Sequence, residues 1–290
     1  MTAYLNGKFM PIAEAKISPL DRGFLFADGA YEVIPVYGRY GFRQEEHMRR
    51  FQVSLDGIRL PNPHTPDEWR ALIKQIIANA PFEDQQLYIQ VTRGADVKRD
   101  AAFPVNVPQT VFMFTAPMAK PSAEMRANGV ACITAPDIRW GRCDLKTVAL
   151  LANSQARQVS VDAGCTETIM IRDGYLTEGS ASNVFIVKNG TLYTPDLTSC
   201  LEGITRATVL TLADELGLKV IEKRITRDEV YCADEAFFTG TAAEVTPIRE
   251  LDRIEIGCGS RGPITEKLQN AFFDIVNGRN PKYAHWLTKV

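Results

Sequence analysis

The sequence predicts an α+β protein of two domains, a small one over residues 1–119 and a larger one over residues 120–290. Hairpin signals and alternating strands dominate the first 43 residues, and helices and strands then mix without the regular alternation of a doubly wound sheet. A length of 290 residues suits one large or two medium domains. The segment Ala119-Lys120-Pro121-Ser122 has the composition of a boundary between them.

The first domain opens with a hairpin, because Asn6-Gly7 separates two short apolar runs. Side chains alternate in character over residues 31–37, and a glycine bounds the segment on each side, so a strand is predicted here. Pro35 favours a place at the edge of a sheet or in a bulge. A helical face follows at Met48, Phe51, Leu55 and Ile58. Thr65-Pro66-Asp67-Glu68 is a capping box with proline at the first helical position. Residues 87–93 and 110–116 predict core strands on either side of a charged loop over 95–107.

The second domain is expected to contain a helix from Val148 to about Asp162. Strands follow over 168–171 and 183–187, and we expect Arg172-Asp173-Gly174 to join them. Further elements are a helix from Gly203-Ile204-Thr205 that stops at Gly217, a capping box at Thr226–Glu229, an apolar strand over 235–241 and a last helix from Pro263 to Gly278.

Composition excludes several function classes. Hydrophobic residues make up 45% of the chain, and 33 basic against 35 acidic residues give a net charge of −2, so a nucleic-acid partner is not expected. No apolar run is long enough for a membrane span, and the first residues lack a secretory leader. The six cysteines are widely spaced, as in a cytoplasmic protein with free thiols. The three histidines are far apart and predict no metal site.

Three features can carry chemistry. Lys146 stands before an apolar segment, where desolvation would make its amine a nucleophile, although a solvated lysine gives the same pattern. Glu178 opens a Gly/Ser loop in which a carboxylate can face a cationic ring nitrogen, or simply lie in an exposed turn. Gly203-Ile204-Thr205 and Gly240-Thr241-Ala242 offer backbone N–H groups to a phosphate, with ordinary capping by Thr205 as the alternative.

An amine nucleophile, a carboxylate for a ring nitrogen and a phosphate cup are the fixtures that pyridoxal phosphate requires. With these in place, the chain resembles the class-IV (fold-type IV) pyridoxal-phosphate-dependent aminotransferases along nearly its whole length, and within them most resembles D-amino acid aminotransferases. The segments that carry the resemblance are Asp21–Ile34, Glu46–Phe51, Gln90–Gly94, Asp144–Lys146, Glu178–Asn183, Leu201–Arg206 and Gly240–Glu244.

The resemblance implies a fold and a site. It implies a small α/β sandwich at the N-terminus, a larger barrel-like C-terminal domain, a homodimer, and pyridoxal 5'-phosphate held between the domains. Lys146 matches the Schiff-base lysine and proton carrier, and Glu178 the partner of the pyridine nitrogen. The remaining cofactor contacts implied are Arg50, Ile204, Thr205, Gly240 and Thr241 around the phosphate, and Leu201 against the ring.

The substrate side departs from the relatives. Tyr31 matches a tyrosine near the substrate carboxylate of the D-specific group. Those enzymes carry an Arg-x-His element in the loop that here follows Thr92-Arg93-Gly94. Arg99 matches its arginine, or Lys98 does if the alignment shifts by one residue. Ala101 stands where the histidine is expected.

The resulting expectation is a ping-pong transaminase that passes the amino group of a D-amino acid to 2-oxoglutarate or pyruvate. An L-branched-chain aminotransferase and an aminodeoxychorismate lyase are alternatives that keep Lys146 and Glu178. A cofactor-binding protein without turnover is an alternative of another class.

Overall fold

The computed structural model describes all 290 residues, which form two compact units. Unit 1 comprises residues 1–118, 145–149 and 276–290, and unit 2 comprises residues 119–144 and 150–275. The first unit therefore includes a short internal piece and the C-terminal tail. Division into independently folding domains over 1–119 and 120–290 stays a prediction.

Unit 1 is built on a seven-stranded antiparallel sheet in the order β16-β4-β3-β5-β6-β1-β2. Its strands are β1 (Thr2–Leu5), β2 (Lys8–Pro11), β3 (Gly29–Tyr37), β4 (Tyr40–Phe42), β5 (Gln85–Thr92), β6 (Thr110–Pro117) and β16 (Leu287–Lys289). Its helices are α1 (Arg22–Phe26), α2 (Gln44–Gly57) and α3 (Pro66–Ala78), with 3-10 turns η1 (Ile12–Glu14) and η2 (Pro281–Trp286).

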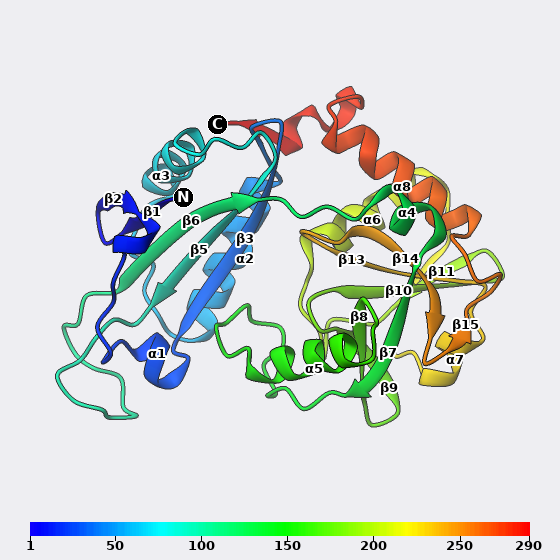
Figure 1. Cartoon of the computed structure of the whole chain (residues 1–290), viewed down its shortest axis with the longest axis horizontal. Helices are drawn as coiled ribbons and strands as arrows, with labels where there is room; N and C mark the ends of the chain where they lie inside the picture. Colours follow the sequence, from blue (N-terminus) through cyan, green and yellow to red (C-terminus); the bar gives the residue numbers. More distant parts are fainter. The chain divides into compact units, whose positions relative to one another are not determined.

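One core joins the sheet of unit 1 to α2 and α3. Alternate residues of β3 and β5, such as Ile34 and Ile89, are fully buried and pack with Phe51 of α2 and Trp69 of α3. Figure 1 shows α2 lying along β3. The alternation predicted from the sequence therefore gives β3 one apolar face, and its other residues are available for a site.

Unit 2 contains a nine-stranded mixed sheet in the order β12-β11-β10-β13-β14-β7-β8-β9, with β15 paired to β14. Its strands are β7 (Val130–Pro136), β8 (Glu167–Arg172), β9 (Tyr175–Gly179), β10 (Asn183–Lys188), β11 (Thr191–Thr194), β12 (Val220–Glu222), β13 (Glu235–Gly240), β14 (Glu244–Leu251) and β15 (Ile254–Glu255). Its helices are α4 (Ala123–Asn128), α5 (Leu151–Asp162), α6 (Ile204–Glu215), α7 (Arg227–Tyr231) and α8 (Pro263–Val276).

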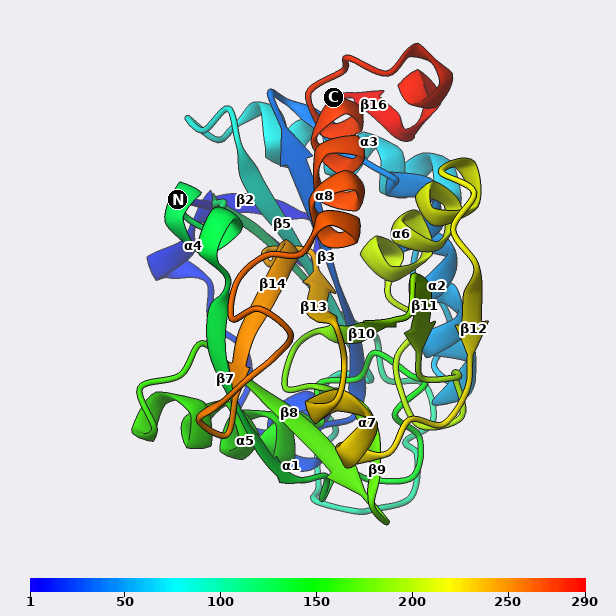
Figure 2. The ribbon, with the colours of Figure 1, turned by 90° about the vertical axis from the view of Figure 1, so that its right-hand side faces the viewer.

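The helices of unit 2 cover its sheet at different strands. Helix α4 packs on β14, α5 on β7 and β8, and α6 on β13, as can be followed in Figure 2. Phe185 of β10 and Phe237 of β13 are register partners and stack at 4.9 Å between ring centroids. No helix of the chain combines the length and apolar character that crossing a lipid bilayer requires.

Local signals in the sequence are confirmed at several elements. Asn6 and Gly7 have positive φ and join β1 to β2, and both capping boxes form, at Thr65 with Glu68 and at Thr226 with Glu229. Pro35, expected at an edge or a bulge, instead lies in an inner strand, because β3 runs between β4 and β5. It is accommodated there because it pairs with Gln86 of β5 while β4 reaches only Val36 and Tyr37, so its missing N–H falls where no partner strand needs it.

Two further expectations are wrong in detail. The helix expected from Val148 begins at Leu151, because the Val148 N–H donates to the Gly29 carbonyl of β3 instead. Arg172-Asp173-Gly174 turns from β8 into the adjacent strand β9 rather than into β10.

Candidate active site

The backbone of unit 1 places Lys146 beside β3. The Tyr31 N–H donates to the Lys146 carbonyl at 3.0 Å, and Val148 donates to Gly29 at 3.0 Å. The Lys146 N–H donates to the Ser54 hydroxyl of α2 at 3.0 Å. Residues 145–149 are thus fastened to both the strand and the helix, and the position of the lysine backbone is fixed.

The side chain of Lys146 lies against Tyr31. Its Nζ donates to the Tyr31 hydroxyl at 3.2 Å and lies 4.2 Å from the ring centroid. The Tyr31 ring in turn stacks on Tyr88 of β5, with 5.6 Å between centroids. Two sequence-predicted site residues are therefore in contact, and the tyrosine that orients the amine is itself held by packing.

A buried ion pair lies next to them along β3. Glu32 is fully buried and accepts from Arg50 Nε at 2.7 Å and from Arg50 Nη2 at 2.9 Å. His47 Nδ1 is 2.8 Å from the same carboxylate. Arg50 therefore stands as one partner of a bidentate pair, a geometry that fixes the direction of its guanidinium.

Burial and charge set the protonation of this cluster. Burial opposes ionisation of Glu32, but the Arg50 charge and the hydrogen bond from His47 outweigh it, and the Glu32 pKa is lowered. Burial also lowers the pKa of His47 below its ordinary value, against the opposing effect of Glu32. His47 is hence neutral at pH 7, and its ring serves as a hydrogen-bond partner rather than a charge.

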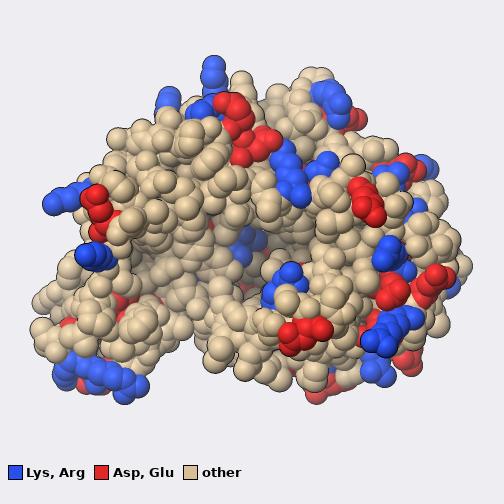
Figure 3. Space-filling model, in the orientation of Figure 1, with Lys and Arg blue, Asp and Glu red and all other residues tan.

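The loop between β5 and β6 carries the predicted carboxylate-binding residues. Lys98 Nζ pairs with Asp100 at 2.9 Å, and the Arg99 guanidinium lies 4.9 Å from the ring centroid of Phe26. Arg22 donates to the carbonyls of residues 100–102 and so anchors the loop from α1. Figure 3 shows basic side chains gathered on this loop, at the lower left of the view. Of the two candidates, Lys98 already has a carboxylate partner.

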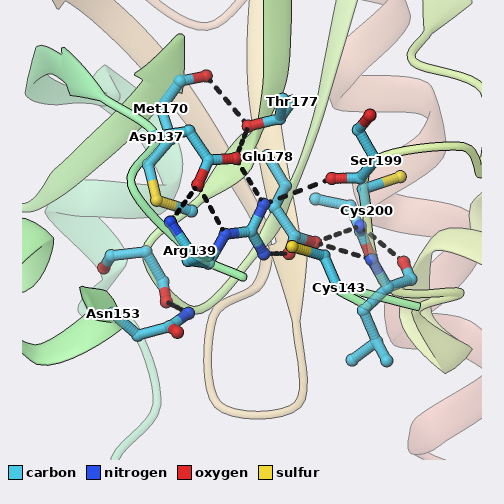
Figure 4. A network of polar contacts seen from close by, with 12 residues as sticks. Asp137, Arg139, Cys143, Asn153, Met170, Thr177, Glu178, Ser199 and Cys200 are labelled. Atoms are coloured by element: carbon cyan, nitrogen blue, oxygen red, sulfur yellow. Dashed lines mark hydrogen bonds and ion pairs between the residues drawn. The ribbon is translucent and has the colours of Figure 1, made fainter. Parts of the chain in front are cut away.

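In unit 2, β9 carries Glu178, and three groups hold its carboxylate (Figure 4). Arg139 donates to Oε1, Asn183 Nδ2 donates to Oε2 at 3.2 Å, and the Leu201 N–H donates to Oε2 at 3.1 Å. Only 8% of the Glu178 side chain is exposed. The structure thus brings together Glu178 and Leu201, which the sequence predicted separately.

The start of α6 has the features of an anion site. Gly203 is its N-cap, and no side chain caps the helix, so capping by Thr205 is not observed. Ile204 and Thr205 are both buried at the first turn, where N–H groups have no acceptor within a helix. A Cβ on Gly203 would lie 1.9 Å from Asn183 Oδ1, so any other residue here would displace the Asn183 side chain. These donors and the positive helix end suit a phosphate.

Gly240 is the last residue of β13, and Thr241 begins the turn to β14. Thr239, immediately before them, is buried with a side-chain hydroxyl that has no partner. Because α6 packs on β13, both predicted phosphate-binding segments belong to neighbouring elements of one unit. The groups of unit 2 therefore fit pyridoxal phosphate: the Glu178 carboxylate suits the ring nitrogen, and the uncapped start of α6 suits the phosphate.

Sequence reasoning missed several polar residues of these clusters. Glu32 is detectable as a charge within an apolar strand, whereas the pattern around His47 predicts only capping or packing on its helix. Asp137 and Arg139 lie two residues apart after β7 and give no signal by themselves. Asn183 is predicted only as the start of a strand.

Comparisons with known proteins identify the family of the chain. The model of the family described as amino-transferase class IV matches residues 29–251. A D-alanine aminotransferase of Bacillus licheniformis is 40% identical over 97% of this chain and 99% of its own length. A branched-chain-amino-acid aminotransferase of Pseudomonas aeruginosa is 37% identical over 99% of this chain and 96% of its own.

Among solved structures, the branched-chain aminotransferase of the thermophilic archaeon Thermoproteus uzoniensis with norvaline superimposes with a TM-score of 0.90 at 34% identity, covering 99% of this chain and 98% of that one. The fold is therefore the two-domain α+β fold of fold-type IV enzymes. The chain belongs to the class IV aminotransferases, which depend on pyridoxal phosphate and transfer amino groups between amino acids and oxo acids.

Proposed function

We propose that this aminotransferase takes D-amino acids as amino donors and 2-oxoglutarate or pyruvate as acceptors. The observation that carries the proposal is the contact between Lys146 Nζ and the Tyr31 hydroxyl, because Tyr31 is the residue matched to the D-specific group. The similarity to the Bacillus licheniformis D-alanine aminotransferase supports it.

Each residue matched to the cofactor would hold one part of it. Lys146 would form the covalent link, Glu178 would pair with the ring nitrogen, and Leu201 would pack on the ring. Arg50, Ile204, Thr205, Gly240 and Thr241 would bind the phosphate. When bound, pyridoxal phosphate supplies an electron sink that stabilises negative charge at the substrate Cα.

The residues of this chain then have separate tasks. Lys146 Nζ removes the Cα proton as general base, and the Tyr31 hydroxyl orients the amine. Glu178, fixed by Asn183 and the Leu201 N–H, keeps a negative charge where the ring nitrogen holds its proton. The first oxo acid leaves before the second binds, which gives ping-pong kinetics.

Arg99 is proposed to bind the α-carboxylate of the substrate. Its guanidinium can form two parallel hydrogen bonds to a carboxylate, whereas Lys98 offers a point charge that Asp100 already neutralises. Arg99→Ala should therefore raise the KM for D-alanine more than Lys98→Ala does, with the cofactor absorbance unchanged. Equal effects of the two variants would assign the carboxylate to another residue.

An L-branched-chain aminotransferase is the second candidate, and the similarity to the Pseudomonas aeruginosa enzyme favours it. A panel of single-turnover reactions with D-alanine, D-glutamate and L-leucine, followed by cofactor absorbance, decides between them. The proposal expects D-alanine to react faster than L-leucine, and the reverse order would establish the branched-chain activity. Pyruvate formation from aminodeoxychorismate without an amino acceptor would instead identify a lyase.

The proposal includes a homodimer in the cytoplasm. Unit 1 exposes large apolar side chains on α1 and on the loop between β5 and β6, where Phe24, Val97 and Val105 are each more than two-thirds exposed. Such exposure is expected of a surface that a second copy of the chain covers. All six cysteines are free, as in a reducing compartment. Light scattering of the purified protein should give twice the chain mass of 32.3 kDa.

A further inference from the structure

Arg139 connects two buried carboxylates in unit 2 (Figure 4). Its Nη1 donates to Glu178, while Nε and Nη2 donate to the two oxygens of Asp137 at 3.0 and 2.8 Å. Nη2 also donates to the Ser199 carbonyl at 3.2 Å. Every nitrogen of the guanidinium therefore has an acceptor, and the planar group has one orientation.

Asp137 in turn holds Arg139 in place. Its side chain is fully buried and also accepts from the Arg139 N–H at 3.0 Å and from the Thr177 hydroxyl at 2.8 Å. Arg172 Nη2 lies 2.9 Å from Oδ1 of the same carboxylate. Through these contacts the aspartate acts on Glu178 by way of Arg139.

Thr177 ties this anchor to the strand that carries Glu178. Its hydroxyl contacts Asp137 and lies 3.2 Å from the Met170 carbonyl of β8, and the next residue of β9 is Glu178. The carboxylate is thus fixed twice, through its own strand and through the guanidinium.

Burying these charges costs free energy, because each group loses its contact with water. Arg139 is 6% exposed and Asp137 is fully buried, and apolar side chains of similar volume often stabilise a core at least as well as a buried ion pair. Stability alone therefore does not account for the cluster. The only member with an assigned chemical role is Glu178.

We propose that Arg139, anchored by Asp137, is a positioning residue for the aminotransferase reaction, which keeps Glu178 ionised and its carboxylate oriented for the ring nitrogen. The inference rests on the proposed function of Glu178. It goes beyond that function because it assigns the charge and the orientation of Glu178 to two further residues.

Lysine could not replace Arg139 in this role. The fork of a guanidinium contacts Asp137 and Glu178 simultaneously, while a single ammonium at the end of a flexible chain cannot span both in the same geometry. Arg139→Lys keeps the charge and removes the fork. Asp137→Asn combined with Arg139→Met removes one charge of each sign, so that neither variant leaves Asp137 as an unpaired charge.

The test uses carboxyl carbon NMR on the protein without cofactor, with the Glu178 signal identified by its absence in Glu178→Gln. We expect its titration midpoint to rise by about one pH unit or more in both Arg139 variants, because a nearby cation is displaced or lost. Arg142→Lys is the matched control, since Arg142 pairs with an aspartate two residues away but is half exposed. Its Glu178 midpoint should equal that of the parent.

Two further readouts separate the outcomes. In the loaded enzyme, Arg139→Lys should lower kcat with little change in KM, and should shift the pH dependence of cofactor absorbance. A fall in melting temperature with an unmoved Glu178 midpoint would show a purely structural role and overturn the inference. Full turnover in Glu178→Gln would overturn the proposed role of Glu178 itself, independently of the midpoint measured for the Arg139 variants.

Discussion

The two units bury charge in opposite ways. In unit 1 one carboxylate, Glu32, lies between Arg50 and His47, whereas in unit 2 one guanidinium, Arg139, lies between Asp137 and Glu178. Each central group fixes the residue to which the site chemistry is assigned. The same principle, a bidentate pair shielded from water, is used once to orient a cation and once to orient an anion.

The difference lies in which charge each cluster orients. In unit 1 the Glu32 carboxylate balances the Arg50 guanidinium and fixes its direction, while His47 adds no charge. In unit 2, Arg172 also pairs with Asp137, so the Arg139 guanidinium balances Glu178 and fixes its direction. Unit 1 thus orients a cation, and unit 2 orients a carboxylate.

The largest effect is expected at Lys146. Lys146→Ala should abolish transamination, since no other group is placed to act as the amine of the reaction. Borohydride reduction and peptide mapping of the parent should locate the cofactor on Lys146. Lys74→Ala, an exposed lysine of α3, is the control and should behave as the parent. A label on any lysine other than Lys146 would contradict the assignment.

A smaller loss of activity is expected at Glu178. Glu178→Gln should reduce kcat by about 10²–10³-fold, the usual loss on removing one electrostatic stabiliser, while the protein stays folded. Steady-state kinetics with saturating cofactor measure it, and circular dichroism checks the fold. Similar kcat values in the variant and the parent would remove Glu178 from the mechanism.

The cluster of Glu32, Arg50 and His47 should make the free energy of unfolding depend on pH in the acid range. Because the Glu32 pKa is lowered, its ionised form stabilises the fold above the ordinary pKa of 4.5, and this contribution is lost as pH falls toward the lower folded value. Glu32→Gln should cost about 3 kcal/mol at pH 7 and make unfolding less sensitive to acid. Urea unfolding between pH 3 and 7 tests this. Glu83→Gln, which breaks an exposed pair with Arg39, should cost less than about 1 kcal/mol.

Arg50 should have the mildest effect, on cofactor retention. Arg50→Ala loses a charge-assisted contact of about 1.5–3 kcal/mol, or roughly 10- to 100-fold in affinity, measured by dialysis against cofactor-free buffer. Since the same change removes the arginine that pairs with the buried Glu32 carboxylate, the double variant Glu32→Gln/Arg50→Ala is the control. Restored retention in the double variant would show that Arg50 acts only on Glu32.

Local chemistry made much of the fold predictable. Thr65 and Thr226 each begin a helix as their capping boxes indicated, and Asn6-Gly7 forms its hairpin, because these signals depend on neighbouring residues alone. The start of α5 was misplaced because a tertiary contact, the Val148 hydrogen bond to β3, overrides the helical pattern. Such a contact is invisible in the sequence.

The candidate site was predicted in the same way. Lys146, Tyr31 and Glu178 were selected because they lie in recognisable motifs. The structure places Lys146 and Tyr31 in contact, and the roles assigned to the three residues stay predictions. Arg139 and Glu32 were not found, because their importance lies in partners far along the chain. Arg139, which follows β7, meets Glu178 of β9 across 39 residues, and the pairing of β8 with both β7 and β9 brings these elements together.

The order of unit 1 along the chain has a consequence for folding. Strand β16 pairs with β4, yet in the sequence it follows all of unit 2. Until β16 pairs, the outer side of β4 is an open strand edge, the kind of surface on which chains aggregate. The segment 145–149, which carries Lys146, also joins β3 from outside the first 118 residues. Unit 1 therefore completes its sheet, and positions Lys146, only with segments that lie far along the chain from the strands they contact.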